Sequence, residues 1–248
     1  MKSAIRATLF FALSALMGAS MLSAVQPAEA AEPGTVSDCV SKALDYLRKM
    51  QQPDGGFAEP GKSSDMNSAW VVAAIASAGE NPNSWRKSGK SPLDWLGAHA
   101  SSWNSLTDIE KACLAVSSAG ANPRSFAGRN LVAEIASRMG SDGHIGGMVN
   151  DHCWGIIALK AAGETAPESC RAWLAARQNI DGGFGFSADG ASDPDDTGAA
   201  IQALIAAGED PKGSVVSRAL SYLRFCQTGD GGFCWRSTLA NTASTAWA

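Results

Sequence analysis

The sequence predicts an all-α fold in which outer and inner helices alternate along the chain, and three observations lead to that prediction. Hydrophobic residues make up 45% of the 248 residues, charged residues only 18%, and glycine occurs 26 times. An Ala-Gly phrase with a proline soon after it recurs four times. A phrase that contains Gly-Gly recurs between these copies. This combination is typical of a helical repeat protein whose turns are fixed by glycine.

The first thirty residues have the pattern of a secretory signal peptide. Lys2 and Arg6 form a basic start, the stretch 7–22 is mostly apolar, and Ala28-Glu29-Ala30 is an A-x-A cleavage pattern. We therefore expect a signal peptide over 1–30 and a secreted or periplasmic mature domain, 31–248. No later apolar run is long enough to span a membrane. The net charge of −4 predicts no nucleic-acid partner.

The Ala-Gly phrases read as helix ends. Glycine takes the left-handed position just after a helix, and proline starts the next element. The glycines are 41, 43 and 45 residues apart. The four copies are Ala78-Gly79-Glu80-Asn81-Pro82, Ala119-Gly120-Ala121-Asn122-Pro123, Ala162-Gly163-Glu164-Thr165-Ala166-Pro167 and Ala207-Gly208-Glu209-Asp210-Pro211.

The second phrase reads as a tight turn. Its Asp-Gly-Gly core needs a positive φ, which glycine adopts without strain. The full copies span 51–57, 178–184 and 227–233, and a weaker copy spans 141–147.

Each repeat therefore holds two helices of different character. The outer helix is amphipathic, as in 41–50, and the inner helix is apolar nearly all round, as in 69–76. Because a helix that is apolar on all sides must be covered on all sides, we expect an inner ring of helices inside an outer ring. An open solenoid of helix pairs is the alternative.

We place the elements by residue range. Outer helices are expected near 36–52, 91–101, 124–140, 167–179 and 212–227. Inner helices are expected near 65–79, 105–120, 148–163 and 194–208, with a fifth beginning near Ser244. The repeats then lie near 36–79, 91–120, 124–163, 167–208 and 212–248. The fifth stops inside an apolar helix, so the ring of about five helix pairs is expected to be incomplete at the C-terminus.

These repeats resemble the prenyltransferase and squalene-cyclase repeat of the terpenoid-cyclase/protein-prenyltransferase superfamily. Three segments match that family's motif of a basic residue, a small residue, an aromatic-Leu pair, Gln, Gly and an aromatic residue. They are Lys42-Ala43, Tyr46-Leu47, Gln51, Gly55 and Phe57; Arg171-Ala172, Trp173-Leu174, Gln178, Gly182 and Phe184; and Arg218-Ala219, Tyr222-Leu223, Gln227, Gly231 and Phe233. The resemblance covers essentially the whole mature chain and implies an α/α toroid. It specifies the fold better than the function.

Asp193-Pro194-Asp195-Asp196-Thr197 is similar to the D-x-D-D-T motif of class II terpene cyclases. That resemblance implies that Asp195 protonates an alkene or epoxide, aided by Asp193 and Asp196. Clustered carboxylates in an apolar cavity favour a protonated form. Two alternatives stay open. Counting back from each Ala-Gly aligns Asp196 with residue types that cap helices, and the acidic loop, with Asp181 and Asp189, could bind calcium.

Trp70, Trp154 and Trp247 occupy the same position of their inner helices. A repeated position of this kind favours packing between the inner helices, and the alternative is that the three rings line a site for an apolar ligand or a carbocation. Six cysteines in an exported chain permit disulfides. Cys226 and Cys234, which flank a glycine turn, are the best candidates for one bridge, and buried free thiols are the alternative.

Two functional hypotheses follow. The first is an exported, non-catalytic domain that binds a bulky apolar small molecule or another exported protein. The second is an enzyme similar to the class II squalene/hopene-type cyclases that uses Asp195 as its general acid. Neither hypothesis calls for a metal ion or an organic cofactor.

Overall fold

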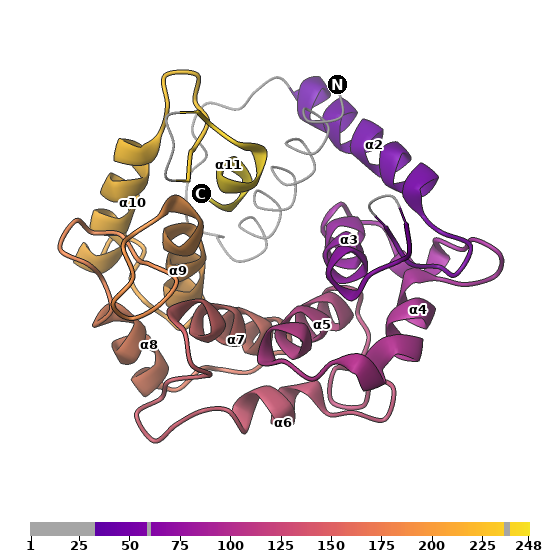
Figure 1. The fold of residues 1–248 in the computed structure, drawn as a ribbon, viewed down its shortest axis with the longest axis horizontal. Coiled ribbons are helices and arrows are strands. Elements are labelled where there is room, and N and C mark those ends of the chain that lie inside the picture. Colours follow the sequence, from indigo (N-terminus) through magenta and orange to yellow (C-terminus); the bar gives the residue numbers. More distant parts are fainter. Residues whose placement is uncertain (1–32, 59–60, 236–238) are drawn as a thin grey trace.

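The computed structural model describes residues 33–58, 61–235 and 239–248, which form two concentric rings of helices (Figure 1). The predicted signal peptide lies outside these residues. The outer ring contains α2 (Pro33–Met50), α4 (Pro92–His99), α6 (Leu131–Ala136), α8 (Glu168–Ala175) and α10 (Ser214–Cys226). The inner ring contains α3 (Asp65–Ser77), α5 (Leu106–Ser118), α7 (Val149–Ala161), α9 (Pro194–Ala206) and α11 (Thr242–Trp247). The predicted α/α toroid is therefore confirmed.

The inner helices curve into a ring. Each packs against the next, from α3 through α5, α7 and α9 to α11. The ring centroids of Trp70 on α3 and Trp247 on α11 are 5.3 Å apart. The curvature therefore brings the side chains of the first and last described inner helices into contact, as expected for a ring rather than an extended solenoid.

The two rings differ in burial as their sequences predict. Outer helix α10 buries three of its 13 residues, Val216, Ala219 and Leu223, which share one face. Inner helix α9, also of 13 residues, buries nine. Inner helices α5 and α7 bury seven and eight of their 13 residues, and this burial accounts for part of the low charge of the chain.

Local hydrogen bonds set the ends of the inner helices. Helices α3, α5, α9 and α11 begin at a polar N-cap whose side chain accepts the N–H group three residues on. At the other end Gly163 has a φ of +83°. The next N–H group, that of Glu164, donates to the carbonyl of Leu159 at 2.9 Å. This six-to-one bond is the Schellman motif, so the Ala-Gly phrase is a helix end as predicted.

The Gly-Gly turns are fastened to the inner helix that follows them. The Phe57 N–H group donates to Ser68 Oγ at 3.0 Å, and the Phe184 N–H group donates to Thr197 Oγ1 at 2.9 Å. The glutamine that opens the turn reaches beyond its own repeat, since Gln51 Nε2 donates to the carbonyl of Trp85 at 2.9 Å. The turns thus connect the two rings and successive repeats.

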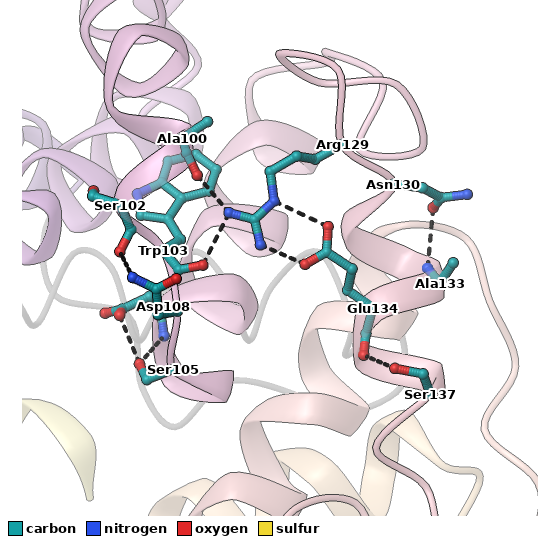
Figure 2. A network of polar contacts seen from close by, with 11 residues as sticks. Ala100, Ser102, Trp103, Ser105, Asp108, Arg129, Asn130, Ala133, Glu134 and Ser137 are labelled. Carbon is teal, nitrogen blue, oxygen red and sulfur yellow. Dashed lines mark hydrogen bonds and ion pairs between the residues drawn. The ribbon is translucent and has the colours of Figure 1, made fainter.

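Helix α6 is the largest departure from the predicted ranges, because it is much shorter than 124–140. Ala127 and Gly128 have φ values of +49° and +79° and form a tight turn that pairs Phe126 with Arg129. The helix can begin only after this turn. Figure 2 shows what the turn achieves: Arg129 donates to the carbonyls of the preceding repeat, with Trp103 O at 3.0 Å.

All six cysteines, including Cys226 and Cys234, are free thiols, so the predicted bridge is not formed in this structure. None of the described helices is long and apolar enough to cross a membrane.

Candidate functional site

A cavity of about 340 Å³ opens where the first turns of α7 and α9 meet the loops that precede α9 and α11. Its wall combines aromatic rings, carboxylates and one amide. The lining residues are Trp70, Asn150, Trp154, Phe186, Asp193, Asp195, Asp196, Ala199, Trp235 and Trp247. All three candidate acids and all three candidate lining tryptophans are therefore brought to one cavity.

The first turn of α9 gives its three aspartates different tasks. Asp193 is the N-cap, and its carboxylate accepts the Asp196 N–H group at 2.8 Å. Pro194 follows at the first helical position, where its missing N–H group costs nothing. The capping interpretation of Asp196 is therefore wrong by three residues. Asp195 neither supplies the capping carboxylate nor donates the N–H group that this carboxylate accepts.

Asp195 presents an unsatisfied oxygen. It is half-buried, and its Oδ1 atom is buried without a hydrogen-bond partner among the described residues. Burial raises the pKa of Asp195, and the charge of Asp193 adds to that rise, while a hydrogen bond with Ser244 opposes it. A carboxyl group with a raised pKa and a free oxygen at a cavity is suited to donate a proton.

Asp196 is held from the neighbouring helix. Asn150 Nδ2 on α7 donates to its Oδ1 at 2.7 Å. Burial, and next the charge of Asp193, raise the pKa of Asp196 to about 7, although the Asn150 bond opposes the rise. The equivalent Asp151 on α7 instead accepts the backbone N–H groups of Gly147 and Met148. Asp196 therefore belongs to the cavity as much as to its helix.

Trp70, Trp154 and Trp247 form a mutual cluster. Their ring centroids are 5.1 to 5.3 Å apart, and each pair is close to perpendicular. Edge-to-face contacts of this kind stabilise aromatic packing. The three rings pack on one another, and they also line the cavity. Their geometry is therefore compatible both with helix packing and with a lining for a ligand.

The acidic loop does not gather its carboxylates around one point. Asp181 accepts the Gly183 N–H group at 2.9 Å and the Ser192 hydroxyl at 2.8 Å, which fixes the turn. Asp189 is exposed. Within the part of the chain that the structure describes, no group of three acidic, histidine or cysteine side chains could hold a metal ion. The calcium hypothesis has no support in this geometry.

Sequence reasoning missed four contributors to the site. Asn150 occupies the same position in its repeat as Asp195 does in the next one. This shared position could have indicated that Asn150 lies beside the aspartates. Ser244, Phe186 and Trp235 come from α11 and from two loops. Loop residues lie outside the helical repeat, so counting along it could not place them.

The family model of the prenyltransferase alpha-alpha toroid domain matches residues 6–129 and 150–242. A drimenyl diphosphate synthase from Streptantibioticus cattleyicolor is 28% identical over 203 residues, which are 78% of this chain and 32% of that protein. One from Streptomyces showdoensis is 26% identical over 212 residues, 82% of this chain and 33% of that protein. The chain thus spans about a third of the length of these curated relatives.

Solved structures share the fold. An ent-copalyl diphosphate synthase from Streptomyces platensis superposes with a TM-score of 0.58 at 15% identity, over 96% of this chain and 48% of that one. The type II terpene cyclase MstE from Scytonema gives a TM-score of 0.60 at 14% identity, over 93% and 70%. A variant of MstE was solved with its substrate, geranylgeranyl dihydroxybenzoate.

These relatives overturn one expectation from the sequence. The chain was expected to be a non-catalytic domain that binds an apolar ligand or a protein partner. The proteins it resembles are drimenyl diphosphate synthases and class II terpene cyclases, which are enzymes. The alternative hypothesis, an enzyme similar to the class II cyclases, is the one they favour.

Proposed function

Because the chain belongs to the prenyltransferase alpha-alpha toroid domain family, we propose that its cavity performs the proton-initiated chemistry of a class II terpene cyclase. The substrate class is an isoprenoid with a terminal alkene or epoxide. The names of the relatives support this class, and the apolar wall of the cavity agrees with it. As a cyclase, the domain converts a linear chain into an isomeric ring system.

One observation carries the proposal: the free, buried Oδ1 of Asp195 at an aromatic cavity. The other two carboxylates are engaged, Asp193 by the helix start and Asp196 by Asn150. Among these three carboxylates, only Asp195 has a buried oxygen without a hydrogen-bond partner in the described residues. A buried polar atom without a partner costs stability, which is typical of a functional group.

In the proposed reaction, Asp195 transfers its proton to one carbon of the terminal alkene. The π electrons form the new C–H bond, and the adjacent tertiary carbon becomes a cation. Further alkenes of the chain attack this cation to close rings, and loss of a proton from the final cation ends the reaction. Asp195 regains its proton before the next turnover. Asp193 and Asp196 act by disfavouring a further negative charge beside them.

The tryptophan cluster supports the same chemistry. The faces of indole rings attract a cation through the ring quadrupole, and the attraction grows when water is excluded. Trp70, Trp154 and Trp247 thus stabilise positive charge on the isoprenoid after protonation. They also replace water, which would capture the cation as an alcohol.

The direct test is incubation with squalene and with geranylgeranyl diphosphate, followed by mass spectrometry for cyclic products. We expect cyclic product from at least one substrate. Asp195→Asn should lower its rate by at least about 100-fold, as is usual when a general acid is removed. Asp189→Asn, which alters an exposed carboxylate in the loop that precedes α9, should leave the rate unchanged. Product that survives Asp195→Asn would refute the role of Asp195, and folded protein that cyclises neither substrate would contradict the proposed function.

A further inference from the structure

Cys226 and Cys234 flank a turn that is closed by a short antiparallel pairing. Gln227 pairs with Phe233, so Cys226 and Cys234 are the next residues outward on the two sides of the turn. Burial raises the pKa of the Cys226 thiol, and the nearby Cys234 adds to that rise, so the two thiols are close to each other. Both side chains are half-buried thiols.

The pair is peculiar to this turn. The residues that correspond to Cys226 and Cys234 are Met50 and Ala58 in the first Gly-Gly-Phe turn. In the second they are Arg177 and Gly185. The repeat itself therefore does not require a cysteine at either position.

We propose that Cys226 and Cys234 form a reversible disulfide that fastens this turn to α10 and thereby fixes one wall of the cavity. The oxidant is a small or protein disulfide. One thiolate attacks a sulfur of that disulfide, forms a mixed disulfide and releases one thiolate of the oxidant. The second cysteine, as thiolate, then displaces the other. The protein loses two protons and two electrons, and the oxidant gains them as two thiols.

The turn transmits this restraint to the cavity through its backbone. The Phe233 N–H group donates to Thr245 Oγ1 on α11 at 2.9 Å, and the Phe233 carbonyl accepts the Asn241 N–H group at 2.9 Å. Helix α11 contributes Trp247 to the cavity wall, and Trp235 directly follows Cys234. The importance of the cavity rests on the proposed function, whereas the bond and its effect on α11 do not.

The test treats the purified full chain with glutathione disulfide and maps thiols by differential alkylation and peptide mass spectrometry. We expect one new linkage, Cys226 to Cys234, so that six thiols become four. Closing a nine-residue loop should raise Tm by about 5 °C, and dithiothreitol should reverse the rise. Hydrogen exchange at Thr245 should slow in the oxidised protein.

The control variants separate the bond from other oxidation. Cys39→Ser removes an exposed thiol on α2 and should keep the linkage and the Tm rise. The double variant Cys226→Ser/Cys234→Ser should lose both. Alkylation of Cys226 and Cys234 after oxidation would overturn the bond itself. A mapped bond with unchanged exchange at Thr245 would overturn its effect on the cavity wall, irrespective of cyclase activity.

Discussion

Replacing Glu110 by glutamine tests whether the buried Glu110 carboxyl is protonated in the folded protein and therefore makes the stability depend on pH. Glu110 lies on α5 and is only 1% exposed. Both of its side-chain oxygens are buried without a hydrogen-bond partner among the described residues. A Cβ atom added at Gly155 on α7 would lie 3.1 Å from Oε1, so α7 approaches this carboxyl closely.

The magnitude follows from the pKa of this group. Burial, with the charge of Asp151 as a smaller cause, raises the pKa of Glu110 from 4.5 to about 9. Between these values the folded protein binds a proton that the unfolded chain releases, so the stability falls as pH rises. At pH 7 the difference amounts to about 3 kcal/mol, from about 1.4 kcal/mol for each pH unit above 4.5. Glutamine has a similar size and no charge to suppress.

The assay is urea unfolding of both proteins at pH 5, 6, 7 and 8. We expect the stability of Glu110→Gln relative to the natural protein to grow by about 1.4 kcal/mol per pH unit over this range. Asp38→Asn, at an exposed carboxylate on α2, is the control and should show no such slope. A difference that stays constant with pH would refute the assignment of Glu110 as a neutral buried acid.

Three further predictions test the site, the fold and the chain start. Asn150→Ala removes the amide that lowers the pKa of Asp196, so this carboxyl should titrate at higher pH in side-chain carbon NMR; an unchanged titration would rule out the contact. Gly163→Ala forces a side chain into a positive φ and should cost about 1 kcal/mol in urea unfolding, whereas Gly147→Ala, where φ is not positive and the added Cβ is equally unhindered, should be near neutral. Export should yield a protein whose first residue by mass spectrometry is Ala31, and an intact N-terminus in secreted material would contradict the predicted signal peptide.

The positions of the inner helices were predictable because the same Ala-Gly phrase marks the helix end in each of four repeats. Gly79, Gly120, Gly163 and Gly208 all adopt positive φ at helix ends, as the Ala-Gly phrases predict. The inner helices consequently begin and end within two residues of the predicted ranges. Helix α6 was predicted too long because the tight turn at Ala127 and Gly128 leaves the hydrophobic pattern of 124–140 unchanged. The pattern alone therefore could not show where the helix begins.

The site was predictable only in part. Counting along the repeat gave the three tryptophans one shared position and placed Asp195 near the start of its inner helix, and the ring geometry then brought them together. The same counting placed the N-cap at Asp196 instead of Asp193, because it recognises a repeated polar residue and not the hydrogen bond that residue makes. The bond from Asn150 to Asp196 depends on the packing of α7 beside α9, and the burial of Glu110 depends on the close approach of α7 at Gly155. Neither contact leaves a pattern in one sequence.

The position of Asp195 has a consequence for how this scaffold can change. Met66, Thr107 and Asn150 share its register, the second residue of an inner helix, and no two of these four side chains are alike. The cap before this position and the third residue after the cap form the hydrogen bonds that start most of the inner helices. The second residue therefore varies while the hydrogen bonds of the helix start stay the same. A functional side chain can be introduced at this position in any repeat without loss of the capping bond, and an acidic residue in place of Thr107 would be the simplest such substitution.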